Sequence, residues 1–212
     1  MATKVHHPLF ARFYAWASTR MEASVFGPRR DELLGGLAGR VIEVGAGNGL
    51  NFAHYPAAVT HVLAVEPEAH LRERAEAAAA QATVPIEVVD GTADSLPAPD
   101  GGYDAAVASL VLCSVPDVPA ALAEIRRVLR PGGQLRFLEH VRADTPGLAR
   151  VQRALDATVW PILGGGCHTH RDTAAAIEAA GLTITDITRL RIDTGVPPTA
   201  PHIIGTATSP GA

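Results

Sequence analysis

A glycine-rich loop with two carboxylates around it is the strongest chemical signal in the chain. Glu43 stands two residues before Gly45, and Gly47 and Gly49 follow at alternate positions. Glycines let a loop turn sharply and let a ligand reach the backbone, whose N–H groups at a helix start can bind an anion. Glu66 comes seventeen residues after Gly49, where a carboxylate can accept hydrogen bonds from both hydroxyls of a ribose. The pattern predicts a nucleoside site.

The glycine spacing also discriminates between nucleoside cofactors. The dinucleotide pattern G-x-G-x-x-G would place its third glycine at position 50, which is occupied by Leu50. A carboxylate at Glu43 repels a pyrophosphate, whereas it suits an α-ammonium group such as that of methionine. The loop therefore favours a nucleoside that carries an amino acid over a dinucleotide.

His140 is the first candidate for proton chemistry. It ends an apolar run at the rim where ligands bind in open α/β sheets. It is therefore placed to act as general base and take a proton from a substrate that binds in its protonated form. The alternative is a histidine that hydrogen-bonds the backbone and orders the segment behind it. The sequence leaves both roles open.

Cysteine and histidine spacing does not predict a metal site. Cys167, His168 and His170 stand together in a glycine-rich run, but no fourth ligand has suitable spacing, so no bound metal is expected. A covalent role for Cys167 is disfavoured as well. The only other cysteine is Cys113, and two cysteines make no disulfide framework, so two free thiols are expected.

Alternating apolar runs and helical patterns supply the elements that position these residues. Buried strands are predicted at Arg40–Val44, Thr60–Val65, Pro85–Val89, Tyr103–Ser109 and Gln134–Val141, with helices over Glu68–Gln81, Pro116–Leu129 and Thr173–Ala180. Asp117 is the predicted N-cap of the second of these helices, and Pro131–Gly133 is predicted to form the turn that ends it. Leu182–Ile192 and His202–Thr208 read as an antiparallel hairpin at a sheet edge.

Two segments lie outside this α/β core within one predicted domain, residues 1–212. The first, residues 1–37, carries five of the ten aromatic residues and is predicted to be a helical lid, with Tyr14 contacting the cofactor. The second, His140–Asp172, is an insert on the substrate side. Its Trp160, Cys167 and His168 are the predicted contacts of the acceptor.

Composition narrows the class of protein. The 212 residues carry a net charge of −4, without the clustered Lys and Arg that nucleic-acid binding requires. No apolar stretch has the length of a signal sequence or a membrane span, so a cytoplasmic protein without a stable membrane anchor is expected. The sequence leaves the oligomeric state open.

With these motifs in place, the sequence resembles the class I S-adenosylmethionine-dependent methyltransferases over nearly its whole length. Residues 91–97 (GTADSLP) are similar to the family element that holds adenine, with Thr92 where an Asp is usual and Asp90 as a possible substitute. Residues 109–115 (SLVLCSV) are similar to the segment under the methionine moiety, and residues 129–133 (LRPGG) to a structural turn. The resemblance implies a Rossmann-like seven-stranded sheet, mostly parallel, with helices on both faces.

The resemblance also implies the cofactor contacts. These predicted cofactor-binding residues are Tyr14, Glu43, Gly45, Gly47, Gly49, Glu66, Pro67, Gly91, Thr92, Ala93, Ser109 and Leu110.

Residues 110–115, 128–133, 139–141 and 201–207, with the Trp160…Cys167…Arg171 pattern, are similar to a narrower branch. It comprises the animal alkyl-thiol methyltransferases, which carry a membrane-anchoring N-terminal helix not seen here, and bacterial relatives. This implies methyl transfer to a small, lipophilic acceptor, with a thiol favoured. An N- or O-methyltransferase of an amine, phenol or phospholipid headgroup is the alternative, as is a non-catalytic S-adenosylmethionine-binding protein.

Overall fold

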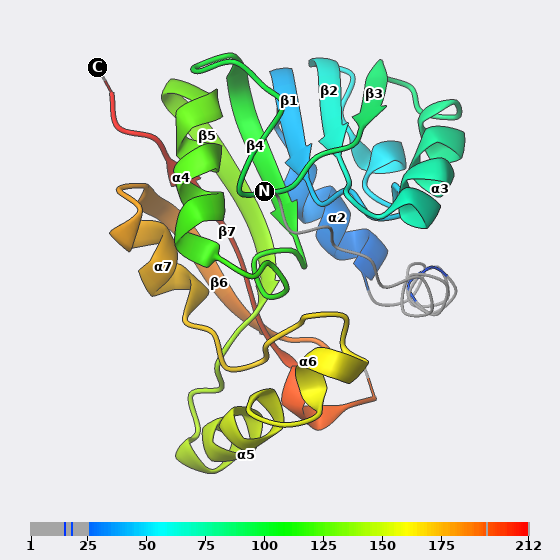
Figure 1. Cartoon of the computed structure of the whole chain (residues 1–212). Helices are drawn as coiled ribbons and strands as arrows, with labels where there is room; N and C mark the ends of the chain where they lie inside the picture. The colour runs from blue at the N-terminus through cyan, green and yellow to red at the C-terminus, as the bar shows by residue number, and fades with distance from the viewer. Residues whose placement is uncertain (1–14, 16–17, 19–25, 194, 212) are drawn as a thin grey trace.

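Seven strands form one mixed sheet in the order β3-β2-β1-β4-β5-β7-β6, as the computed structural model shows for residues 15, 18, 26–193 and 195–211 (Figure 1). Strands β1 to β5 run parallel, and β7 pairs antiparallel with both β5 and β6. The strands are β1 Gly39–Val44, β2 Val59–Val65, β3 Ile86–Val89, β4 Tyr103–Ser109, β5 Leu129–His140, β6 Thr183–Arg191 and β7 Pro201–Thr208. The predicted α/β fold is confirmed, including the antiparallel pair at one edge.

Burial explains why the central strands are easy to recognise in the sequence. The last four residues of β1 are all buried, as are four consecutive residues of β4, because helices cover both faces of a parallel sheet. Strand β6 is mostly exposed, which fits its place at the sheet edge. Because β1 pairs parallel with both β2 and β4, the carboxyl ends of these three strands lie at one rim of the sheet.

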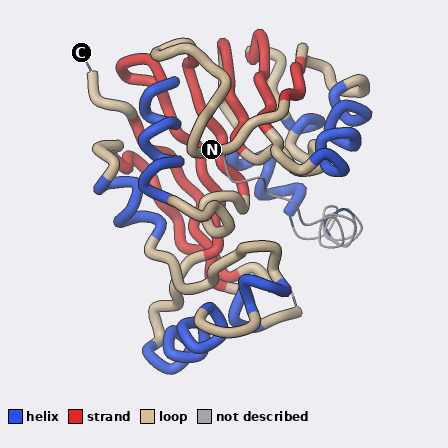
Figure 2. Tube along the Cα trace, in the orientation of Figure 1, coloured by secondary structure: helices blue, strands red, loops and turns tan. Residues whose placement is uncertain are grey.

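Helices pack on both faces of the sheet (Figure 2). α2 (Gly27–Leu34) and α3 (Ala69–Ala79) share one apolar cluster, and α4 (Val118–Val128) and α7 (Thr173–Ala179) share the other. Leu33 and Leu34 of α2 are completely buried among strand residues. The predicted lid boundary at residue 37 is therefore wrong, because the stretch after residue 26 belongs to the core.

The insert adds two helices beyond the carboxyl ends of the strands. α5 (Pro146–Asp156) and α6 (Trp160–Leu163) lie together below the sheet in Figure 1, next to the short helix η3 (Pro197–Thr199) before β7. The buried side chain of Gln152 in α5 joins this helix to η3 and to the segment after β5, since its amide donates to Pro198 O and Val141 O and accepts from Ala143 N–H. A second short helix, η2 (Phe52–His54), follows the glycine loop.

The predicted N-cap of α4 is confirmed, and the helix ends one residue before its predicted end. Asp117 caps its start, with Oδ1 accepting from Ala120 N–H at 2.9 Å. The helix stops at Val128, and the bounds of β5, from Leu129, include Pro131–Gly133. The pairing with β4 nevertheless passes from Leu129 directly to Gln134, so the chain is irregular where the turn was predicted. Gly132 has a φ of 73°, and its N–H donates to the carbonyl groups of Ser209 and Pro210 near the C-terminus.

Predictions for the N-terminal segment fall mostly outside the described residues, Tyr14 among them. Among the helices that are described, none combines the length and the apolar composition needed to cross a bilayer.

Candidate active site

A cavity of about 400 Å³ opens at the rim where the carboxyl ends of the parallel strands meet. This is where ligands bind in open α/β sheets, and the volume suits a small-molecule cofactor or substrate. Most of the predicted site residues line it: Gly45, Gly47, Glu66, Pro67, Gly91, Thr92, Ala93, Ser109, Leu110, His140, Trp160 and Cys167. One cavity therefore joins the predicted cofactor and acceptor residues.

The glycine loop follows β1 in a conformation that side chains disfavour. Gly45, Gly47 and Gly49 have φ values of 66°, 58° and 80°. A Cβ on Gly45 would lie 2.5 Å from a methyl group of Val111, so the loop packs directly on the segment after β4. The sequence motif thus brings backbone without side chains, at Gly45 and Gly47, to the cavity wall.

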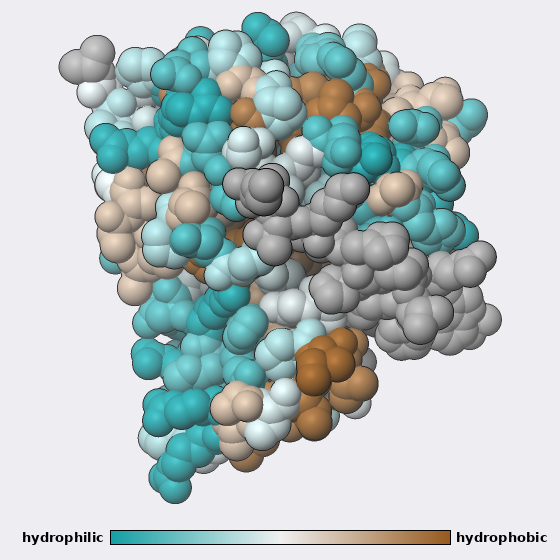
Figure 3. All heavy atoms as spheres, viewed as in Figure 1, coloured by the Kyte–Doolittle hydropathy of each residue, from teal (hydrophilic) through white to brown (hydrophobic). Residues whose placement is uncertain are grey.

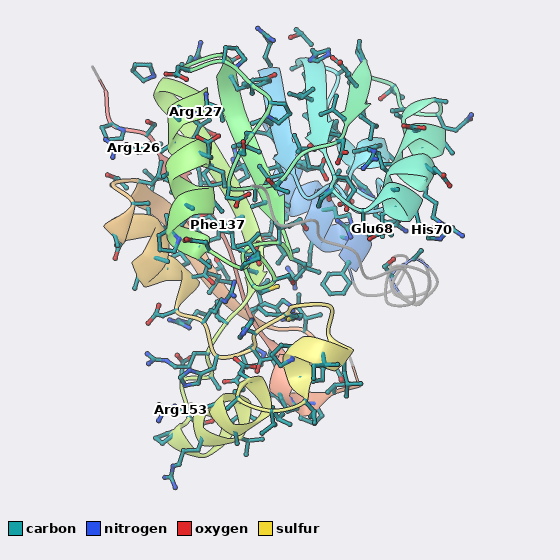
Figure 4. All side chains as sticks on the ribbon, in the orientation of Figure 1. Glu68, His70, Arg126, Arg127, Phe137 and Arg153 are labelled. Atoms are coloured by element: carbon teal, nitrogen blue, oxygen red, sulfur yellow. The ribbon has the colours of Figure 1, made fainter. Side chains whose placement is uncertain are left out.

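Glu66 holds that loop and still has capacity for a ligand. Its carboxylate accepts hydrogen bonds from Gly47 N–H at 2.8 Å and from Glu68 N–H at 2.9 Å. A carboxylate offers about four lone-pair sites, so about two remain, one for each hydroxyl of a ribose. Burial raises the pKa of Glu66, while these two hydrogen bonds lower it. Glu68, labelled in Figure 4 beside the start of α3, also lines the cavity.

The adenine-side prediction needs one correction. Thr92 and Ala93 line the cavity, but Asp90 does not; its carboxylate lies 3.2 Å from the guanidinium of Arg72. Within residues 90–97 the acidic residue that lines the cavity is Asp94, to which the sequence pattern gave no role. A bridge between Thr92 and Ser95 folds this segment back, which explains why a later residue takes the position.

Glu43 and Gly49 lie outside the cavity lining. The oxygens of Glu43 accept from Tyr55 Oη–H at 2.6 Å and from the Asn51 side-chain amide at 2.8 Å. Burial raises the pKa of this carboxyl to about 7, opposed by the two hydrogen bonds and by Arg30. In this structure Glu43 braces the loop from behind, a role that the motif's spacing alone does not reveal.

Residues 109–113 form the floor of the cavity. Leu110 has a left-handed φ of 61°, which is rare for a residue with a side chain and frequent at functional sites. Glu139, completely buried, supports the turn: its carboxylate accepts from the backbone N–H groups of Val111, Leu112 and Cys113 at 2.9 to 3.1 Å. Sequence reasoning assigned no role to Glu139, although its place one residue before His140 at the strand end was a usable signal.

His140 meets both cysteines at the acceptor end of the cavity. Its Nδ1 lies 3.4 Å from Cys167 Sγ, and the side chains of Cys113, His140 and Cys167 bring their donor atoms within 4.8 Å of one another. The ring of His140 packs on the ring of His202, with centroids 4.3 Å apart. Burial lowers the pKa of His202 to about 3, helped by its histidine neighbour. The sequence predicted His140 and Cys167 here but not Cys113.

The insert closes the acceptor end. Trp160 lines the cavity, and its indole N–H is a buried donor without a hydrogen-bond partner among the described residues. His168 lies outside the lining; its Nδ1 is 2.8 Å from Gly166 O and 3.2 Å from the guanidinium of Arg171. Ile162 and Leu163 of α6 are 80% and 67% exposed, and a hydrophobic surface lies over α6 in the lower part of Figure 3.

Of residues 1–25, only Ala15 and Ser18 are described, and both contact residues of the cofactor end. Ser18 Oγ accepts from the Asn48 side-chain amide in the glycine loop at 3.3 Å. Ala15 packs on Leu71 of α3, which lines the cavity.

Known proteins with similar sequences are methyltransferases. A family model described as a methyltransferase domain matches residues 42–137. Thiol S-methyltransferase TMT1B of Homo sapiens is 34% identical over 179 residues, covering 82% of this chain and 73% of that protein. Ubiquinone/menaquinone biosynthesis C-methyltransferase UbiE of Methylobacterium nodulans is 43% identical over 79 residues, covering 37% of this chain and 31% of that protein.

A solved S-adenosylmethionine-dependent methyltransferase from Mesorhizobium loti superposes with a TM-score of 0.64 at 19% identity, covering 89% of this chain and 99% of that one. At that identity the likeness concerns the fold.

Proposed function

This chain belongs to the S-adenosylmethionine-dependent methyltransferases, and we propose that its acceptor is a small lipophilic thiol. It is an enzyme that uses S-adenosylmethionine as cofactor and a small molecule as methyl acceptor. The thiol assignment is supported by the similarity to thiol S-methyltransferases over most of both chains. It is supported independently by the apolar insert and the soft sulfur groups at the acceptor end.

In this proposal the cofactor lies along the rim from β3 to β4. Glu66 binds the two ribose hydroxyls with its two remaining lone-pair sites, and Asp94 accepts from the adenine amino group. Gly45, Gly47 and the segment at Ser109 and Leu110 hold the methionine part against backbone groups. The residues present fit the cofactor, because a carboxylate, glycines and an apolar floor stand where ribose, backbone contact and the sulfonium chain need them.

The observation that carries the chemistry at the acceptor end is the position of His140, whereas the choice of a thiol rests on the similarity to thiol S-methyltransferases. Its imidazole stands in the same cavity as Glu66, at the end walled by Trp160 and Cys167. The cofactor supplies an activated methyl group, so the protein's main work is alignment, which can offset about 7–11 kcal/mol of barrier. A thiol, with a pKa of about 8.5, needs only a modest base, and we assign that role to His140.

The experiment is a panel of acceptors with isotopically labelled S-adenosylmethionine. We expect label transfer to lipophilic alkyl and aromatic thiols, and little or none to amines and phenols matched in size. Transfer to an amine or phenol alone would replace the thiol by a nitrogen or oxygen acceptor. Tight cofactor binding without transfer to any acceptor would instead favour a binding protein.

A further inference from the structure

Two cysteines that are far apart in the sequence meet at the acceptor end. Cys113 follows β4 and Cys167 follows α6. The backbone N–H of His168 donates to the carbonyl of Cys113 at 2.7 Å, so the two chain segments run side by side at the cysteines. Gly166 makes this approach possible, because a Cβ there would lie 3.0 Å from Ser114 O, and its φ is 93°. The two sulfur atoms lie within 4.8 Å of each other.

The surroundings give the two thiols unequal character. The neighbouring thiol of Cys113 lowers the pKa of Cys167 well below its usual range, burial opposes this shift, and the imidazole of His140, 3.4 Å away, lowers the pKa further. The proximity of Cys167 and burial raise the pKa of Cys113. Thiolate is the attacking form in disulfide exchange, so Cys167 would react first and Cys113 second.

Access is limited to one direction. Cys113 and Cys167 are only 1% and 7% exposed, yet both line the cavity. A reagent therefore reaches them through the space that the acceptor occupies, between Trp160 and the segment after β4. That space suits small apolar molecules better than charged ones or proteins.

We propose that Cys113 and Cys167 form a reactive dithiol that exchanges with small apolar organic disulfides entering the acceptor end. The Cys167 thiolate attacks one sulfur of the disulfide RSSR, forms a mixed disulfide and releases RS⁻. Cys113 then loses its proton to solvent, its thiolate attacks the Cys167 sulfur, and a second RS⁻ leaves. Both cysteines are oxidised to one Cys113–Cys167 disulfide, RSSR is reduced to two thiols, and an external dithiol resets the pair.

The role of this dithiol in the enzyme rests on the proposed function. A disulfide of the acceptor would be cleaved inside the acceptor site, which leaves a thiolate in the position from which it is methylated. The chain thereby gains a second activity, reduction of the acceptor's disulfide, that the methyl transfer itself does not require.

The test uses the whole chain, reduced and freed of reductant, with a chelator present and no cofactor. The probe is 2,2′-dithiodipyridine, a neutral aromatic disulfide whose released thione is measured by absorbance. Because Cys113 and Cys167 are the only cysteines, every product can be assigned by intact mass. The wild type should release two thiones per chain and lose two hydrogens in mass.

Two matched variants separate the roles. Cys113→Ser should release one thione and keep one thiopyridyl adduct on Cys167. Cys167→Ser should react at least about tenfold more slowly, because its remaining thiol is buried and has a raised pKa. If a variant does not fold, the wild type alone decides, by comparing its rate at pH 6 with that of the chain unfolded in denaturant. Faster reaction in the folded chain supports the proposal.

Two thiopyridyl adducts on the wild type, or slower reaction in the folded chain than in the unfolded one, would overturn the proposal. Its failure is distinguishable from that of the thiol methyltransferase assignment, since thione release needs no cofactor. Thione release without thiol methylation would leave the dithiol and remove the acceptor assignment. Thiol methylation without thione release would remove the dithiol proposal and leave the acceptor assignment.

Discussion

The two ends of the cavity are built in different ways. The cofactor end is assembled from short segments that directly follow β1, β2 and β3, around Gly47, Glu66 and Asp94. The acceptor end is assembled from the turn after β4, the end of β5 and a remote insert, around Cys113, His140 and Cys167. The first needs only the parallel sheet to exist, whereas the second needs a particular packing of the insert on that sheet.

The two ends also differ in what their polar groups do. At the cofactor end, backbone N–H groups are held by Glu66, and the loop is braced from behind by Glu43. At the acceptor end, reactive side chains lie against one another and a buried indole N–H of Trp160 has no partner among the described residues. A preformed backbone cradle suits a constant cofactor, and a side-chain pocket suits a variable acceptor. Substitutions should therefore affect the two ends separately.

The largest effect should come from Gly47→Val. A β-branched residue is strongly disfavoured at φ 58°, and its side chain would enter the cofactor's space. Calorimetry should show S-adenosylmethionine affinity reduced by more than roughly 100-fold, the equivalent of at least about 2.7 kcal/mol. The control is Gly36→Val, at φ 75° in open space away from the cavity, which should cost stability but leave the affinity unchanged. Native affinity in a folded Gly47→Val protein would refute this placement.

Next is Glu66→Ala. Loss of charge-assisted hydrogen bonds to the two ribose hydroxyls should weaken cofactor binding by roughly 2–4 kcal/mol, or about 30- to 1000-fold. Glu66→Gln, which keeps the size and one acceptor oxygen, should fall between this variant and the wild type. Both are measured by calorimetry. Unchanged binding in Glu66→Ala would remove Glu66 from the cofactor site.

A smaller and more selective effect is expected from His140→Ala. Below the acceptor's pKa, turnover should fall by about 100-fold because the base is lost, with cofactor affinity little changed. At higher pH a thiol ionises by itself, so the variant's rate should recover toward that of the wild type. His168→Ala is the comparison, since His168 lies outside the cavity lining and should show no such pH-dependent loss. An equal loss for His140→Ala at every pH would mean that His140 only shapes the insert.

The smallest effect concerns the N-terminal segment, which the sequence predicts to close over the cofactor. Ser18→Ala removes the hydrogen bond to Asn48 in the glycine loop, which should weaken cofactor binding by about 2- to 10-fold, or roughly 0.5–1.5 kcal/mol. Hydrogen exchange in residues 1–23 should slow when cofactor is added. Equal exchange with and without cofactor would indicate a purely structural segment.

The sequence by itself determined the sheet and the cofactor end. Buried strands such as Tyr103–Ser109 contain continuous apolar runs, here residues 105–108, and a glycine loop has few possible conformations, so local pattern fixes both. It could not determine that Glu43 faces Asn51 and Tyr55, or that Asp94 and not Asp90 reaches the cavity. Those outcomes depend on which way a side chain points after the loop has packed.

Only the tertiary structure decided the acceptor end. The sequence grouped Cys167 with His168 and His170, its near neighbours, whereas the fold places Cys167 with His140 and Cys113. The glycine at position 166 and the hydrogen bond from His168 N–H to Cys113 O bring these distant segments into contact. Contacts across more than fifty residues depend on how the insert packs against the sheet, and no local spacing encodes that packing.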